Sequence, residues 1–174
     1  MSEISFSVFP TAVGPCGIVW RGATASVLAL MLPEASEPAL RKRLDRHYNN
    51  AAESSPPPSI DRVTQKIADL LEGRPTDLSD VELDMAQIPA FHRRVYTLAR
   101  SIPFGATMSY GELATQLGCP NAARAVGQAL GRNPWALIVP CHRVLAKNGK
   151  LTGFSAHGGL ATKRRLLQLE GVTV

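Results

Sequence analysis

The chain of 174 residues is 45% hydrophobic and 19% charged, which is the composition of an ordinary globular protein long enough to bury a core. It has no apolar run that could span a bilayer, and its start lacks the basic flank and apolar segment of a secretory signal, so we expect a cytoplasmic protein without a membrane partner. Three widely spaced cysteines argue against a disulfide framework or a zinc site, and we expect no metal and no cofactor.

Charge divides the chain into two unlike parts. Residues 1–90 hold 8 Lys/Arg and 12 Asp/Glu, a net charge of −4, whereas residues 91–174 hold 11 and 2, a net charge of +9. A strongly basic half favours a polyanionic partner, nucleic acid before others. A solvated basic face without any partner remains an alternative.

The first residues predict a β-hairpin. Residues 4–9 alternate with the period of a half-buried strand, Gly14 and Pro15 indicate a turn, and residues 17–20 fit the returning strand. Cys16 lies at that turn and is expected to be structural.

Two helices and a further strand complete the N-terminal part. A charged helix is predicted over residues 36–48, and Ser59 is expected to cap a second helix after the proline-rich loop 54–58. Residues 81–85 alternate again and predict a last strand. Because no catalytic residues gather in this part, residues 1–88 are expected to form a scaffold domain, with the boundary close to residue 88.

The pattern of residues 89–174 is mainly helical. Ser109 and Glu112 fit a capping box at the start of one helix, and Asn121 is expected to cap the next, over residues 122–130. Two short helices joined by a tight turn predict a helix-turn-helix. A preceding helix has one apolar face, made of Phe91, Val95 and Leu98.

The second helix of this pair is unusual for its small residues. Arg124 is its only charged residue, whereas a helix that reads the major groove normally carries several long polar side chains. Such a helix could lie against a narrow surface such as the minor groove and direct a single arginine inward, or it could be an alanine-rich core helix. The small residues are Ala122, Ala123, Ala125, Gly127 and Ala129.

The strongest candidate for chemistry is the thiol of Cys141. A cysteine is a nucleophile only as the thiolate, so it needs a base or a positive charge nearby, and His142 is the next residue. Pro140 favours an exposed turn at this point. Taken alone, the pair also fits a small buried cysteine beside a structural imidazole.

Three groups of motifs together resemble the O6-alkylguanine-DNA alkyltransferases over residues 91–174. They are Pro140-Cys141-His142-Arg143-Val144, then Ala122–Gly127 with Asn133-Pro134, and finally Gly158-Gly159-Leu160, Lys163, Leu166-Leu167 and Glu170-Gly171. The resemblance implies an α/β (α+β) fold, with a ribonuclease-H-like domain at 1–88 and a mostly helical DNA-binding alkyltransferase domain with the helix-turn-helix at 89–174. For residues 1–85 the likeness extends only to the general layout.

The resemblance implies direct-reversal DNA repair by a methylated-DNA–protein-cysteine methyltransferase. Such a protein flips an O6-alkylguanine out of duplex DNA and transfers the alkyl group irreversibly to its cysteine, in one turnover. Here Cys141 would attack the alkyl carbon, His142 would take the thiol proton through water, and Glu170 would hold His142 in place. Tyr110 would assist the leaving guanine and crowd the target phosphate, and Asn133 would tie the second helix to the cysteine turn.

The family also implies how DNA is held. Arg124 would replace the extruded base in the stack, while Ala122, Ala123 and Gly127, with Tyr110, would fit the minor groove of double-stranded DNA. The protein is expected to act as a monomer. The base pocket would be formed by Trp135, Val144, Phe154 and Ser155.

Several residues depart from the family pattern. The loop between Cys141 and Lys163 is slightly longer than in some relatives, and Trp135 stands where smaller residues are common. His157 has no family role and is expected to be exposed. Arg143 is expected to form a structural ion pair.

Other functions remain open on the sequence. A non-catalytic sensor of alkylated guanine would lack the cysteine that this chain has. A cysteine hydrolase would use Cys141 and His142 without DNA, and a helix-turn-helix regulator would bind a specific sequence; neither accounts for the helix of small residues around Arg124.

Overall fold

A four-stranded mixed sheet forms the N-terminal half of the computed structural model, which describes residues 3–174. The strand order is β3-β2-β1-β4, and all neighbours are antiparallel except β4, which runs parallel to β1. The strands are β1 (Ile4–Phe9), β2 (Cys16–Arg21), β3 (Ser26–Met31) and β4 (Ala52–Glu53). The predicted hairpin is therefore confirmed, with Cys16 as the first residue of β2 rather than part of the turn.

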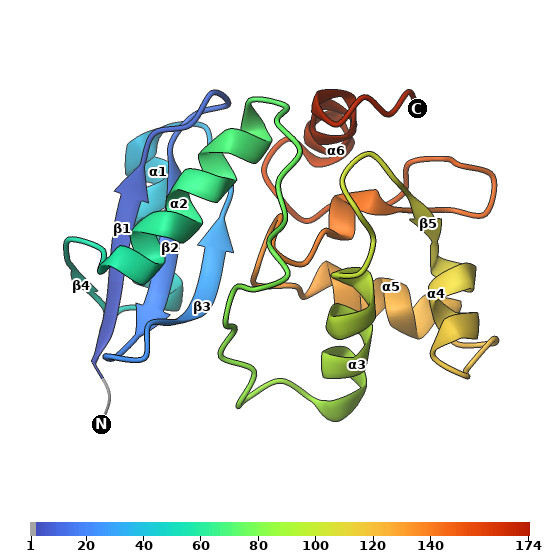
Figure 1. Ribbon diagram of the computed structural model, residues 1–174, viewed down its shortest axis with the longest axis horizontal. Helices are drawn as coiled ribbons and strands as arrows, with labels where there is room; N and C mark the ends of the chain where they lie inside the picture. Colours follow the sequence, from blue (N-terminus) through green and yellow to red (C-terminus); the bar gives the residue numbers. More distant parts are fainter. Residues whose placement is uncertain (1–2) are drawn as a thin grey trace.

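One helix packs on each face of this sheet, and Figure 1 shows α2 in front of it and α1 behind. Helix α1 (Glu37–His47) begins after Ser36, whose side chain accepts a hydrogen bond from Ala39 N, and α2 spans Pro58–Leu71. Because successive side chains of a strand point to opposite faces, the strands supply two cores. One contains Val19, Ala29, Met31, Leu40 and Leu44, and the other includes Ile18, Trp20, Val27, Ile60 and Ile67.

Residues 89–174 form four more helices, a short 3₁₀ turn and a two-stranded parallel sheet. Pairing of Met108 with Val144 in that small sheet holds the start of α4 beside the residues that follow Cys141. The elements are α3 (Ala90–Ala99), β5 (Met108–Ser109), α4 (Tyr110–Gln116), α5 (Ala123–Gly131), η1 (Cys141–Arg143), β6 (Val144–Leu145) and α6 (Gly159–Leu169).

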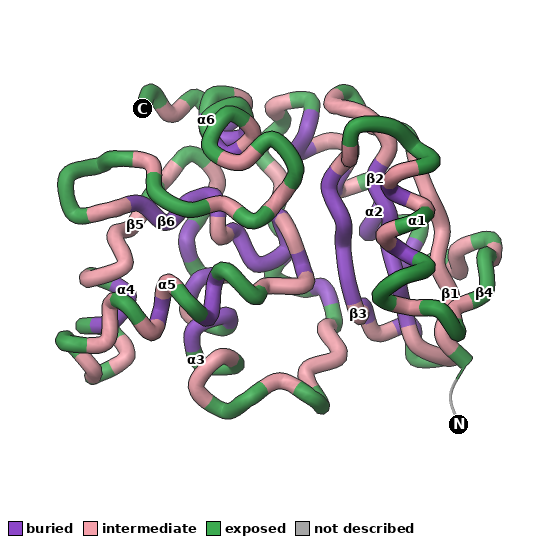
Figure 2. Tube along the Cα trace, turned by 180° about the vertical axis from the view of Figure 1, so that it is seen from behind, coloured by how far each residue is buried: buried purple, intermediate pink, exposed green. Residues whose placement is uncertain are grey.

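The edge strand β3 joins the two halves. Leu30 N donates to the carbonyl of Pro134 over 3.0 Å, and the Leu30 carbonyl accepts from Ala136 N over 3.3 Å. Between these contacts the fully buried Trp135 donates its indole N–H to the carbonyl of Val27 over 2.7 Å. Figure 2 shows β3 largely buried. The segment that leads to Cys141 is therefore fixed to the sheet.

The mixed α+β architecture and the capping box at Ser109 and Glu112 are confirmed, since Glu112 N donates to Ser109 Oγ while the Glu112 carboxylate accepts from Ser109 N. Two predicted caps are wrong. Helix α2 starts at Pro58, ahead of Ser59, because proline needs no hydrogen-bond acceptor in the first turn. The cap of α5 is Ala122 rather than Asn121, and it makes no side-chain hydrogen bond.

The predicted strand at residues 81–85 is also wrong. Only Leu83 forms a bridge there, parallel to Val27, and the segment pairs with β3 at that one residue without forming a strand. Conversely, β3 itself was not predicted, because its continuous apolar sequence does not alternate. None of the helices formed by residues 3–174 combines the length and hydropathy needed to cross a membrane.

Candidate active site and DNA-binding surface

The backbone before Cys141 makes two tight turns. Leu137 has a φ of +68°, in the left-handed region that non-glycine residues rarely adopt, and Ile138 N donates to Ala136 O across it over 2.8 Å. Pro140 is the centre of a second three-residue turn, in which Cys141 N donates to Val139 O over 2.8 Å. These turns place Cys141, half-buried and free of any disulfide, at the start of η1.

Asn133 holds this segment in shape. Its Nδ2 donates to Val139 O over 2.9 Å and to Trp135 O over 3.3 Å, while its Oδ1 accepts from Trp135 N over 2.9 Å. One side chain thereby links the end of α5 to the residues just before the thiol. The sequence-based role of Asn133, to connect helix and cysteine turn, agrees with these contacts.

His142 and Arg143 share one buried carboxylate. His142 Nε2 lies 2.8 Å from Glu170 Oε1, and the Arg143 guanidinium contacts both carboxylate oxygens at 2.8–3.1 Å. Gly105 N adds a bond of 3.1 Å to Oε2, and Arg143 Nη1 donates to Ile102 O over 2.7 Å. Arg143 is therefore the structural ion-pairing residue that the sequence predicted.

This arrangement decides the protonation of His142. Burial favours the neutral acid of Glu170, but the hydrogen bonds from His142 and Arg143 outweigh it and lower the pKa of Glu170 to about 2. An ionised carboxylate can only accept, so His142 Nε2 carries the proton. Burial lowers the pKa of His142, which leaves Nδ1 unprotonated. Nδ1 is buried and has no partner among residues 3–174.

The thiol of Cys141 is held mainly as the neutral form. Burial raises its pKa, against the opposing influence of the Asn133 side chain and of the positive charge of Lys163. Nucleophilic attack therefore requires that a base take the thiol proton as the reaction starts. The unprotonated Nδ1 of His142 is the candidate for this base, and the His142 ring is held in place by Glu170.

Tyr110 and Lys163 line the other side of the site. Tyr110 O–H donates to Thr152 O over 3.3 Å, and burial raises the pKa of this tyrosine, so it stays protonated. The fully buried Lys163 donates to Val144 O over 2.7 Å and to Thr152 O over 3.1 Å, and its Nζ lies 3.5 Å from Tyr110 Oη. Burial lowers the pKa of Lys163. Lys163 belongs to one of the family motifs, but its local sequence does not indicate a role in the site.

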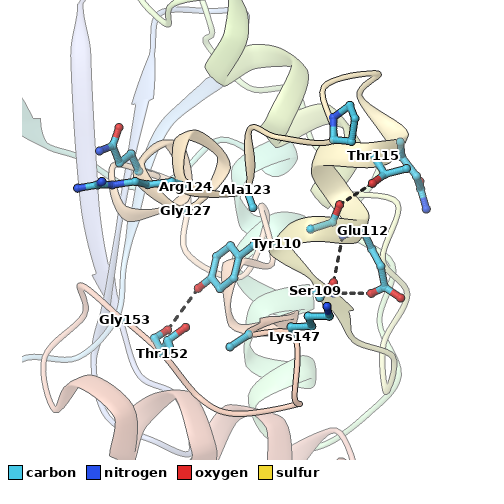
Figure 3. Close-up of a pocket in the computed structure, with 15 residues that line it drawn as sticks. Ser109, Tyr110, Glu112, Thr115, Ala123, Arg124, Gly127, Lys147, Thr152 and Gly153 are labelled. Carbon is cyan, nitrogen blue, oxygen red and sulfur yellow. Dashed lines mark hydrogen bonds between the residues drawn. The ribbon is translucent and has the colours of Figure 1, made fainter.

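A wide groove of about 1130 Å³ extends from Tyr110 along α4 and α5. Ala123, Arg124 and Gly127 of α5 line it, and the predicted DNA-binding residue Ala122 is not among its lining residues. Ala122 and Ala123 are both partly buried against the core. Figure 3 shows Tyr110 turned toward Thr152 and the Arg124 side chain extended from α5. Arg124 is exposed, and within the described chain it forms no ion pair.

A smaller cavity of about 310 Å³ adjoins this groove and reaches Cys141. Phe154 and Ser155 line it as predicted, but two other predicted pocket residues do not. Trp135 is buried against β3 and stacks edge-on against Tyr96, and Val144 faces the core from β6. The complete lining is Tyr110, Gly127, Leu130, Gly131, Cys141, Gly153, Phe154 and Ser155.

Two further predictions concern His157 and metal binding. His157 is exposed, as expected, and its Nδ1 lies 3.6 Å from Glu34 Oε2. No cluster of three or more metal-ligating side chains occurs in residues 3–174.

Comparison with known proteins places this site in a family. The methylated-DNA–protein-cysteine methyltransferase of Mycobacterium tuberculosis is 38% identical over 167 residues, which cover 96% of this chain and 92% of that protein. The chain belongs to the methylated-DNA–protein-cysteine methyltransferase family. A profile described as "6-O-methylguanine DNA methyltransferase, DNA binding domain" matches residues 90–172.

Solved structures of this methyltransferase family share the fold. The crystal structure of Mycobacterium tuberculosis OGT in complex with DNA has a TM-score of 0.75 and 36% identity, with 95% of this chain and 92% of that chain covered. The O6-methylguanine-DNA methyltransferase of Pyrococcus kodakaraensis has a TM-score of 0.71 and 27% identity, with 98% and 100% covered. The protein is thus a DNA-binding methyltransferase of DNA repair, as the motifs of its C-terminal half predicted.

Proposed function

We propose that this protein removes alkyl groups from O6 of guanine in duplex DNA and keeps them on Cys141, once per molecule. The observation that carries the proposal is the position of the thiol. Cys141 lies in the wall of a cavity that adjoins the groove along α4 and α5, and the next residue is a buried histidine with an unprotonated ring nitrogen.

The proposed reaction is a displacement at the alkyl carbon. The thiol proton passes to His142 Nδ1 through water, and Glu170 stabilises the imidazolium that forms. A bond forms between Cys141 Sγ and the alkyl carbon while the bond from that carbon to O6 breaks. The product is a thioether, which no group in the site can cleave, so each molecule would react once.

The leaving group would be neutralised by Tyr110. Guanine departs as an anion, and a protonated phenol beside it can donate a hydrogen bond or a proton. Lys163 adds a positive charge behind the phenol, with its Nζ at 3.5 Å from Tyr110 Oη. We assign Lys163 to the site for this reason.

The groove suggests how the base would reach the thiol. A base in a duplex is inaccessible to Cys141, so it must be rotated out of the helix, and unstacking and unpairing it requires a few kcal/mol. Arg124 is exposed and unpaired at the start of α5, where it could fill the space in the stack. Small residues at Ala123 and Gly127 would let α5 approach the minor groove.

We further propose the following assignments for the parts of the chain. Helices α4 and α5 act as a helix-turn-helix, residues 89–174 form the DNA-binding domain, and residues 1–88 form a ribonuclease-H-like scaffold. The protein would act as a monomer in the cytoplasm, associated with the nucleoid if its source is prokaryotic.

The deciding experiment is the mass of the intact protein after mixing with duplex DNA that carries one O6-methylguanine. We expect a gain of one methyl group, absent in Cys141→Ala. Tight lesion binding without a mass gain would instead favour a non-catalytic damage sensor. If the protein neither binds the lesion nor takes up the methyl group, both functions are refuted.

A further inference from the structure

A second cavity reaches Cys141 from the side of the N-terminal sheet. It measures about 350 Å³ and lies between α1 with β3 on one side and residues 131–136 with residues 154–156 on the other. In the view of Figure 2, β3 lies between α5 and α1. It shares four residues with the smaller cavity described above, namely Gly131, Cys141, Phe154 and Ser155. The thiol therefore lies where two cavities meet.

The geometry of the displacement at the alkyl carbon suggests a role for the second cavity. Sulfur, the reacting carbon and O6 must lie nearly in line, so any chain on that carbon points sideways from this axis. A methyl group needs no extra room, but a longer substituent needs space beside Sγ, before and after transfer. If the base occupies the cavity next to Tyr110, the cavity next to β3 is left for the substituent.

The charge of this cavity is one-sided. Its floor is partly apolar, from residues of β3 such as Leu30 and Met31, while Arg43, His47 and Arg132 supply basic groups, and no aspartate or glutamate is among its lining residues. Arg43 Nη1 donates to Glu34 over 2.6 Å from outside the cavity, so its charge is partly balanced.

Arg132 is the uncompensated cation of this cavity. It is exposed at the end of α5, and within residues 3–174 its side chain has neither an ion pair nor a hydrogen bond. A cation without a counter-charge beside a partly apolar space favours a ligand with a short carbon chain that ends in an anion.

We propose that the cavity lined by Arg43 and Arg132 selects O6-alkyl substituents that end in a carboxylate over neutral substituents of similar size. The inference rests on the proposed function. The bonds formed and broken are those of methyl transfer, and the product on Cys141 is an S-carboxyalkyl thioether, with the carboxylate held beside the arginines.

The test compares three duplexes of one sequence that differ only in the lesion: O6-methyl-, O6-(2-hydroxyethyl)- and O6-carboxymethylguanine. The readout is the ratio of the transfer rates of the carboxymethyl and hydroxyethyl groups, because DNA affinity common to both cancels. We expect the ratio to fall about three- to five-fold in Arg132→Gln, the size of one partly exposed ion pair, and to fall also in Arg43→Gln. Arg46→Gln is the matched control, since Arg46 is an exposed residue of α1 that does not line the cavity.

The outcomes separate the inference from the function beneath it. Equal slowing of all three lesions in the arginine variants would show that these cations contact the DNA backbone, and would overturn the inference. An unchanged ratio with normal methyl transfer would overturn it as well. Failure of the wild-type protein to take up methyl on Cys141 would instead refute the proposed function itself.

Discussion

Replacing Glu170 with glutamine should weaken both the fold and the transfer reaction. The carboxylate side chain is fully buried and is the only anion in contact with Arg143 among the described residues. Removing one partner of a buried ion pair costs about 3–5 kcal/mol, because the other charge stays buried without compensation. The fall in the pKa of Glu170 from 4.5 to about 2 corresponds to roughly 3 kcal/mol, which agrees with the lower end of that range. We therefore expect the Tm to fall by about 10 °C.

The same variant should react more slowly. Without the anion, the His142 imidazolium that forms during attack loses its stabilising charge, and we expect the transfer rate at pH 7.5 to fall about 10²-fold. Urea unfolding and single-turnover transfer measure the two effects. Glu72→Gln is the control, because Glu72 pairs with Arg74 at the surface and should change stability by less than about 1 kcal/mol. Wild-type stability and rate in Glu170→Gln would refute the account of the buried network.

Three further changes have defined outcomes. The stability difference between wild type and Glu170→Gln should be complete above pH 4.5 and shrink as pH falls toward 2, because the depressed pKa stabilises the fold only while the carboxylate is ionised; urea titrations across that interval would show it, and a constant difference would contradict it. Arg124→Ala should slow transfer from duplex DNA far more than transfer from free O6-benzylguanine, and equal slowing would rule out a role in base extrusion. Trp135→Phe should lower the free energy of unfolding by about 1 kcal/mol, since the indole bond to the Val27 carbonyl is lost while that carbonyl still accepts from Asp84 N; an unchanged value would mean that the indole bond does not help to join the halves.

The sequence predicts local structure well where one short stretch determines it. Ser109 and Glu112 satisfy each other's backbone within a single turn, so their capping box needs no other part of the chain. The cap predicted at Asn121 was wrong because the turn is closed by backbone instead, with Ala122 N donating to Cys119 O over 2.8 Å.

The candidate site was predictable to the extent that its residues lie in the motifs. Cys141 and His142 are adjacent, and the family resemblance supplied Glu170. The position of Trp135 depends on β3, a strand more than a hundred residues earlier, and no local pattern indicates that its indole bonds to Val27 there. The burial of Lys163 was not predictable for a similar reason, because a lysine in a helix is ordinarily solvated and only the fold buries it beside Tyr110.

The covered edge of β3 also limits how the chain can be truncated. An open strand edge with unpaired amides invites other chains to pair with it and aggregate. Here both ends of that edge are occupied from within, since Val27 bonds to Glu82 and Asp84 while Leu30 bonds to Pro134 and Ala136. A fragment that lacks residues 134–136 would expose half of this edge to solvent. A fragment that lacks β3 would expose the side chain of Trp135 to water. Truncations of this chain should therefore keep β3 and residues 134–136 together.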